Sequence, residues 1–134
     1  MSCLFCAIVA GEIPSRQVYA DDRAVAFLDI QPWHAGHTLV VPRRHCDDVL
    51  ADPVALTEIA PAVSATARLL ADRLGADGMN LLSNAGSVSG QEVFHLHVHL
   101  IPRYADSPGM GRMIQRGKKI DLDAVHAKIV GDNR

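Results

Sequence analysis

The sequence has no run of 18 consecutive apolar residues, so it lacks the stretch that a membrane-spanning helix needs. Its first residues also lack a basic segment followed by an apolar one, and we therefore expect no secretory signal and a cytoplasmic location. Neither sign of charge dominates, because 13 Lys and Arg against 15 Asp and Glu leave a formal charge of −2. This balance argues against nucleic-acid backbones and anionic membranes as partners, and it is compatible with a small phosphate ligand.

Cysteine is scarce, with three residues at positions 3, 6 and 46. Three cysteines cannot all pair within one chain, and a reducing compartment disfavours a structural disulfide. The spacing Cys3-x-x-Cys6 therefore indicates metal or redox chemistry, with a fortuitous pair as the alternative. Hydrophobic residues make up 49% of the chain and no repeat or linker is evident, so we expect a single domain over residues 1–134.

The most unusual stretch lies between Phe94 and Pro102, where histidines alternate with apolar residues. Side chains alternate between faces along a strand, so a strand would put His95, His97 and His99 on one face, with next neighbours roughly 7 Å apart. Neutral imidazole is a nucleophile near physiological pH, and neighbouring imidazoles can donate hydrogen bonds or protons. The pattern indicates a phosphate-handling or metal-binding site, and a half-exposed strand whose polar face happens to be histidine is the simpler alternative.

Apolar periodicity and turn signals predict the remaining elements. In chain order these are a short helix or turn within residues 1–17, a hairpin with strands at 18–20 and 24–28, a third strand at 37–42, a long helix at 52–74, a fourth strand at 79–82, the histidine strand, and a short helix at 122–130. A meander with a long helix inserted between its third and fourth strands predicts an α+β fold with a five-stranded antiparallel sheet. A partner subunit could cover the sheet's edges.

The long helix carries signals at both ends. Asp52 is the candidate N-cap, Pro53 occupies the first helical position, and Gly75 follows the end. Pro61 cannot donate a backbone hydrogen bond, so we expect a kink there, or a short turn before the principal helix.

Two kinds of site fit these residues. One histidine could attack phosphorus while the other histidines and backbone amides near Gly90 stabilise the phosphate oxygens. Zinc takes histidine nitrogen and cysteine sulfur in tetrahedral sets, so Cys3, Cys6 and two histidines could hold it instead. The two sites are compatible, because one histidine could bind zinc while its neighbours face a substrate.

The run His95-Leu96-His97-Val98-His99-Leu100-Ile101 resembles the signature of the histidine triad (HIT) family. Further matches occur in the family's order: Phe27-x-Asp29-Ile30, His37-x-x-Val40-x-Pro42-x-x-His45, Asn84 and Gly90-Gln91. The resemblance covers residues 3–104, is nearest to the Hint-like bacterial branch, and leaves residues 105–134 as a C-terminal extension.

This resemblance implies a homodimer in which two five-stranded sheets join. It also implies a nucleotide hydrolase or transferase that acts at the α-phosphorus of purine nucleoside phosphoramidates or adenylates, with no organic cofactor. His97 would be the nucleophile and form a transient nucleotidyl-histidine that water hydrolyses. His99 would hold the phosphate oxygens, and His37 would sit behind the triad and fix the orientation and tautomer of an imidazole.

The family also implies a nucleotide pocket in which Asp29 accepts hydrogen bonds from ribose hydroxyls and apolar side chains line a slot for the base. The implied substrate-binding residues are Phe5, Ile8, Phe27, Asp29, Ile30, Asn84, Gly90, Gln91 and His99. Without the resemblance, the apolar members would be interpreted as core and Asp29 as a turn residue.

Some bacterial members carry a structural zinc on an N-terminal Cys-x-x-Cys, the histidine that closes the third-strand motif, and the first triad histidine. The corresponding residues here are Cys3, Cys6, His45 and His95, so the resemblance implies a zinc site. His95 would then be a metal ligand that stiffens the segment carrying His97.

One departure from the family pattern is Glu92, where many relatives have serine or threonine after Gly-Gln. Its carboxylate would repel a phosphate if it pointed inward, and it could favour a cationic leaving group. Two alternatives stay open: a dinucleoside polyphosphate hydrolase that uses the same nucleophile, and a nucleotide- or zinc-binding regulatory module without catalysis. Cys46, His34 and His126 have no part in this scheme.

Overall fold

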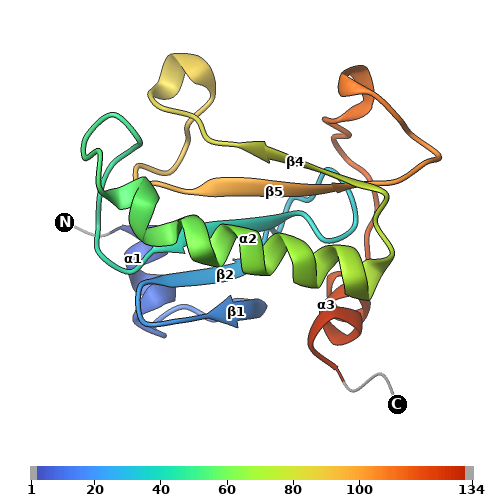
Figure 1. Cartoon of the computed structure of the whole chain (residues 1–134), viewed down its shortest axis with the longest axis horizontal. Helices are drawn as coiled ribbons and strands as arrows, with labels where there is room; N and C mark the ends of the chain where they lie inside the picture. Colours follow the sequence, from blue (N-terminus) through green and yellow to red (C-terminus); the bar gives the residue numbers. More distant parts are fainter. Residues whose placement is uncertain (1–2, 132–134) are drawn as a thin grey trace.

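A five-stranded antiparallel sheet with a long helix along one face forms the protein in the computed structural model, which describes residues 3–131 (Figure 1). The ends of the predicted domain range, residues 1–2 and 132–134, lie outside the described residues. The strands are β1 (Gln17–Ala20), β2 (Ala24–Leu28), β3 (Thr38–Pro42), β4 (Gly78–Leu82) and β5 (Val98–Arg103), in the spatial order β1-β2-β3-β5-β4. The helices are α1 (Leu4–Val9), α2 (Ala55–Leu74) and α3 (Leu122–Val130), with 3-10 turns η1 (Ser87–Ser89) and η2 (Met110–Arg112). The predicted α+β class and its element order are confirmed.

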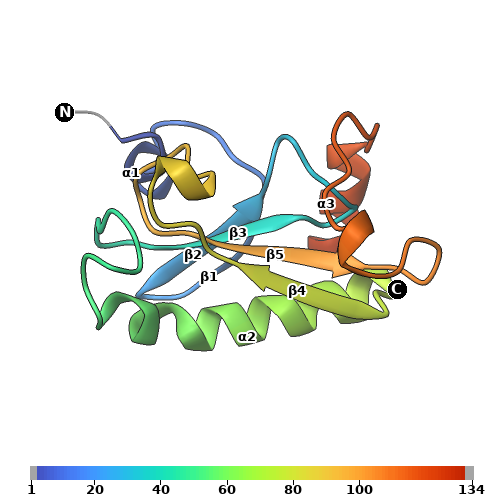
Figure 2. The ribbon, with the colours of Figure 1, turned by 90° about the horizontal axis from the view of Figure 1, so that it is seen from above.

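Strands β2 and β3 in the interior of the sheet are buried on both faces, and each face packs against a different helix. Ala26 and Leu28 of β2 pack in the cluster that contains Ile59 and Leu70 of α2. Phe27, on the opposite face of β2, packs in a second cluster with Phe5 of α1. Figure 2 shows α2 along one side of the sheet and α1 on the other. The face that carries α1 is therefore the face on which β2 presents Phe27.

The long helix begins later than predicted and continues through its proline. α2 starts at Ala55, and the Asp52 carboxylate accepts the backbone N–H of Val54 at 2.9 Å in the turn before it. The prediction that Asp52 caps the helix directly is therefore wrong. The alternative prediction that the helix breaks at Pro61, with only a short turn before that residue, is also wrong, because α2 runs without interruption from Ala55 through Pro61. Pro61 is exposed, so the carbonyl that loses its helical hydrogen bond there is on the solvent side of α2. Gly75 ends the helix in the left-handed region at φ +66°, as predicted.

The histidine strand is shorter than predicted, because β5 begins at Val98. His95 and His97 therefore lie in the irregular segment before it, and strand alternation does not determine where their rings point. The backbone N–H of Leu96 donates to the carbonyl of Cys46 at 2.6 Å, and the Ser83 hydroxyl donates to the carbonyl of His97 at 2.8 Å. These contacts with distant parts of the chain replace strand pairing. Within residues 3–131, no helix combines the length and apolar character needed to cross a bilayer.

The packing of α2 on the sheet predicts a contrast between two leucines of the same helix. Leu70 is fully buried, whereas Leu56 is 41% exposed. Leu70→Ala leaves a cavity and should lower the free energy of unfolding by about 3 kcal/mol, while the matched control Leu56→Ala should cost less than about 1 kcal/mol. Urea denaturation of the two variants measures both values. Equal losses would contradict the assignment of Leu70 to the core.

Candidate functional site

A hollow of about 450 Å³ opens beside the α1-covered face of the sheet. His97 and His99 line it, together with eight of the nine predicted substrate-binding residues, a count that includes His99: Phe5, Ile8, Phe27, Asp29, Ile30, Asn84, Gly90 and His99. Asn84 and Gly90 reach the hollow from the loop that contains η1. The structure thus gathers side chains from α1, β2, β5 and two loops around one space large enough for a small ligand.

Gln91 is the predicted substrate-binding residue that the structure places elsewhere. Its side chain is buried, accepts the backbone N–H of Gly86 at 2.7 Å and donates to the carbonyls of Asp47 at 2.7 Å and Val93 at 3.1 Å. Both polar atoms of the Gln91 amide are therefore engaged by the backbone. Gln91 shapes the loop and does not line the hollow.

The ring of His97 is held in one tautomer by the chain's own backbone. Its Nδ1 lies 2.8 Å from the carbonyl oxygen of His95, and a carbonyl can only accept, so Nδ1 carries the proton. In the neutral ring Nε2 is then unprotonated, which makes it the nitrogen with a free lone pair. Phe5 packs edge-on against this imidazole, with ring centroids 5.0 Å apart. His97 therefore presents a nucleophilic nitrogen in a fixed orientation.

A chain of hydrogen bonds fixes the opposite tautomer on His99. The backbone N–H of Trp33 donates to Nδ1 of His37 at 3.0 Å, so the neutral His37 ring carries its proton on Nε2. That Nε2 donates to Nδ1 of His99 at 2.9 Å, which leaves the proton of His99 on its own Nε2. His99 is thus a hydrogen-bond donor at Nε2. His37 therefore lies directly against the last of the three alternating histidines.

Burial keeps these imidazoles neutral. It lowers the pKa of His99 to about 3, helped by the nearby His37 and His97, and it lowers the pKa of His37 to about 4 although the Asp29 carboxylate opposes the shift. Burial also lowers the pKa of His97 below its usual value. At neutral pH all three rings are uncharged, which the tautomer assignments require.

Asp29, His37 and His99 also form a group compact enough to suggest a metal site. The proton on Nε2 of His37 argues against it, because that atom already donates to His99. The Asp29 carboxylate lies 3.6 Å from the same Nε2 and accepts the backbone N–H of Gln31 at 2.8 Å. The group is better described as a hydrogen-bonded pair, His37 and His99, with the Asp29 carboxylate close by.

Trp33 is a site residue that the sequence analysis missed. Its ring stacks on His99 with an interplanar angle of 4° and a centroid distance of 5.6 Å, and it also lines the hollow. The only signal in the sequence is its position as the single tryptophan, four residues before His37. Arg16 and Arg116 line the hollow as well and were not predicted.

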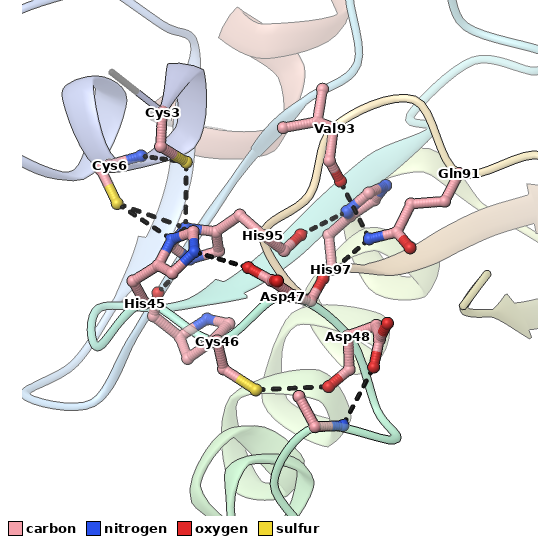
Figure 3. A network of polar contacts seen from close by, with 12 residues as sticks. Cys3, Cys6, His45, Cys46, Asp47, Asp48, Gln91, Val93, His95 and His97 are labelled. Atoms are coloured by element: carbon pink, nitrogen blue, oxygen red, sulfur yellow. Dashed lines mark hydrogen bonds and ion pairs between the residues drawn. The ribbon is translucent and has the colours of Figure 1, made fainter. Parts of the chain in front are cut away.

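A second group of side chains lies on the other side of His95. Cys3 and Cys6 of the α1 segment point toward His45 and His95 (Figure 3). Nδ1 of His95 is 3.5 Å from each of the two sulfurs, and Nδ1 of His45 is 3.4 Å from the Cys6 sulfur. The two Nδ1 atoms are 3.2 Å apart.

These distances match a tetrahedral zinc site. Zinc–sulfur and zinc–nitrogen bonds of about 2.3 and about 2.1 Å separate sulfur from nitrogen by about 3.6 Å and nitrogen from nitrogen by about 3.4 Å. Nε2 of His95 donates to the carbonyl of Pro42 at 2.8 Å, and Nε2 of His45 donates to the Asp47 carboxylate at 2.9 Å. Both Nδ1 atoms therefore direct lone pairs at each other, an arrangement that a cation between them would stabilise. The donor set fits zinc.

The residues without an assigned role in the sequence lie away from both groups. His34 is fully buried, and its Nε2 donates to the carbonyl of Arg112 at 2.9 Å. Cys46 is buried in the α2-facing cluster. His126 on α3 donates from Nε2 to the carbonyl of Gln17 at 2.8 Å. Glu92, by contrast, lies at the site: it is exposed and lines the hollow.

Comparison with known proteins connects these observations. The family model for the HIT domain matches residues 10–106. An uncharacterized HIT-like protein from Methanocaldococcus jannaschii is 45% identical over 133 residues, which cover 96% of this chain and 99% of that protein.

Two solved structures are similar over nearly the whole chain. A hypothetical histidine triad nucleotide-binding protein from Sulfolobus tokodaii has a TM-score of 0.79 and 33% identity, covering 98% of this chain and 99% of that one. A zinc-bound histidine triad family protein from Mycobacterium smegmatis has a TM-score of 0.76 and 33% identity, covering 98% and 91%. The chain therefore belongs to the HIT family, a superfamily of nucleotide-binding hydrolases and transferases.

Proposed function

We propose that the protein hydrolyses purine nucleoside phosphoramidates or related adenylates at the α-phosphorus, through a nucleotidyl-histidine on His97. The observation that carries this proposal is the pairing of opposite tautomers on adjacent rings. Nε2 of His97 is unprotonated, whereas Nε2 of His99 carries a proton, and both rings line the same hollow. A nucleophile beside a neutral donor is the arrangement that attack on an anionic phosphorus centre needs.

In the proposed first step, Nε2 of His97 forms a bond to phosphorus while the P–N bond breaks, and the leaving amine takes up a proton from water. Nε2–H of His99 donates to a phosphate oxygen as negative charge gathers there. In the second step, water cleaves the bond between phosphorus and His97 and releases the nucleoside monophosphate. A neutral His99 suits both steps, because it donates a hydrogen bond without trapping the phosphate as an ion pair.

The rest of the hollow supports a nucleotide as the ligand. Phe27 and Ile8 supply apolar walls for a base, and Asp29 offers a carboxylate oxygen to ribose hydroxyls. Gly90 has a φ of +109°, and a Cβ there would meet the Asn84 amide at 3.4 Å. A glycine at this position therefore leaves room for the Asn84 side chain at the hollow. The Sulfolobus tokodaii relative is described as nucleotide-binding, which agrees with this proposal.

We also propose a structural zinc on Cys3, Cys6, His45 and His95. The donor geometry and the zinc-bound relative from Mycobacterium smegmatis support it. Bound zinc would tie the N-terminal segment to the segment that precedes β5, and it would supply structural rather than catalytic chemistry. Since the carbonyl of His95 holds the proton of His97, fixing the His95 ring also fixes the acceptor that sets the nucleophile's tautomer.

A homodimer is the proposed assembly. β4 lies at one edge of the sheet, and its Leu81 is 57% exposed. α3 packs beside β1 at the other edge. An edge strand with an exposed apolar side chain is a favourable surface for a second copy of the chain.

Replacement of the nucleophile tests the proposed reaction. His97→Ala should lower turnover of an adenosine phosphoramidate at least about a thousandfold, because the covalent step loses its attacking atom. His126→Ala, a histidine-to-alanine change outside the hollow, is the matched control and should keep its activity. Because a P–N bond to histidine hydrolyses in acid, turnover is quenched with denaturant at alkaline pH. Wild-type protein should then be heavier by one nucleotidyl group, and His97→Ala protein should lack this adduct.

Full turnover by folded His97→Ala would refute the covalent mechanism. Faster turnover of a dinucleoside polyphosphate than of the phosphoramidate would favour the P–O–P alternative. Nucleotide binding without turnover by the wild type would favour a regulatory module.

Metal analysis tests the zinc proposal. Protein purified without added metal should contain about one zinc ion per chain by elemental analysis, and Cys6→Ser should lose most of it. Cys46→Ser, a cysteine outside the four-residue cluster, is the matched control and should keep its zinc. Chelation should lower the melting temperature of the wild type. A zinc content below about a tenth of an equivalent in the wild type would exclude a resident structural zinc.

Sedimentation velocity at micromolar concentration tests the assembly. The wild type should sediment as a species of about twice the 14.4 kDa chain mass. Leu81→Asp should shift it toward the monomer, because the new charge would be buried in the contact through β4. A wild-type species of the mass of one chain would rule out the dimer.

A further inference from the structure

A second hollow, of about 760 Å³, adjoins the proposed nucleotide hollow. The loop between β2 and β3 lines it on one side, and residues 116–122 line it on the other. Ile30, Gln31, Trp33 and Arg116 line both hollows. The two spaces therefore meet at the loop that follows Asp29 and at Arg116.

Positive charge gathers in this second hollow. Arg116, Lys118 and Lys119 line it and are exposed, and no ion pair with a carboxylate involves them among residues 3–131. One carboxylate of the described chain, that of Asp121, lines the hollow, and it accepts the backbone N–H of Ala124 at the start of α3. Glu92 lines only the first hollow. Three cations against one engaged carboxylate leave the second hollow net positive.

The segment that carries these cations is anchored on both sides. Before it, the buried His34 donates to the carbonyl of Arg112, and Met113 is buried. After it, the Arg16 guanidinium pairs with Asp123 of α3 at 2.8 Å. Figure 2 shows this C-terminal segment at the same end of the sheet as the loop between β2 and β3. Anchoring reduces the ordering cost of ligand binding, so the cations form a prepared surface.

We propose that this second hollow binds a second anionic group of the substrate, in addition to the α-phosphate. The inference rests on the proposed function, because the second hollow can bind a second anionic group of the substrate only if the first hollow holds the nucleotide. That group belongs either to the leaving-group side of the α-phosphorus or to the ribose, since Arg116 and the residues after Asp29 line both spaces. Substrates with a second phosphate or carboxylate are thus preferred over those with a neutral or cationic appendage.

Equilibrium binding tests this inference without requiring turnover. Isothermal titration calorimetry compares AMP, ADP and adenosine 3′,5′-bisphosphate on the full chain. At least one of the two ligands with a second phosphate should bind about tenfold more tightly than AMP, as expected for two or three partly exposed charge pairs. Tighter ADP would place the second anion on the leaving-group side, and tighter bisphosphate would place it at the ribose.

Two double variants with the same change in net charge distinguish the effect of the lysines in the second hollow from the effect of the protein's overall charge. Lys118→Glu/Lys119→Glu should abolish the preference for the second phosphate. Arg68→Glu/Lys128→Glu changes the net charge equally at exposed positions outside both hollows and should retain it. Circular dichroism of each variant checks that it is folded.

Equal affinities for all three ligands in the wild type would overturn the inference. So would a preference that survives Lys118→Glu/Lys119→Glu, a preference that is lost equally in both variants, or the absence of measurable binding by every ligand. The proposed reaction is judged separately by turnover of a phosphoramidate. Tight binding of the second phosphate without turnover would support this inference and count against the proposed function.

Discussion

A neutral imidazole has one proton and two nitrogens, so a hydrogen bond at one nitrogen decides what the other can do. The candidate site depends on this constraint in four neighbouring rings. The carbonyl of His95 leaves Nε2 of His97 unprotonated, and the N–H of Trp33 acts through His37 to leave a proton on Nε2 of His99. The carbonyl of Pro42 leaves Nδ1 of His95 free to meet the cysteine sulfurs. Burial keeps the rings neutral. This matters because a protonated imidazole carries a proton on both nitrogens and could not act as a nucleophile or a metal ligand.

The sheet brings these rings together by being covered on both faces. β2 and β3 are apolar on both sides, which allows α2 to pack on one face and α1 on the other. Phe5 of α1 then contacts both Phe27 and His97, while Cys3 and Cys6 at the ends of the same short segment approach His95. The short helix α1 and its N-cap residue Cys3 thus supply the ring that packs on the proposed nucleophile and two ligands of the proposed zinc. Loss of the proposed zinc would therefore alter the position of Phe5 against His97 in the hollow.

Local patterns in the sequence predicted most of the fold. Short apolar runs bounded by a polar turn and by Pro42 predicted the hairpin and the third strand, and periodicity with Gly75 predicted the long helix and its end. The start of β5 could not be predicted in this way, because the segment before it is held by distant partners such as the carbonyl of Cys46. Of the substrate-binding residues that the resemblance implies, Gln91 is the one that does not line the hollow. Trp33 and Arg116 could not be predicted in this way. The stacking of Trp33 on His99 and the position of Arg116 between the two hollows depend on tertiary contacts, which local sequence spacing does not reveal.

The acceptor that holds the proton of His97 is the backbone carbonyl of His95. Every amino acid at position 95 would possess that oxygen, so no single side-chain replacement deletes it. What a replacement can change is the direction in which the carbonyl points. The tautomer of the proposed nucleophile therefore depends on the backbone conformation at residue 95. Alanine scanning would reveal this dependence only at positions where the substitution changes that backbone conformation.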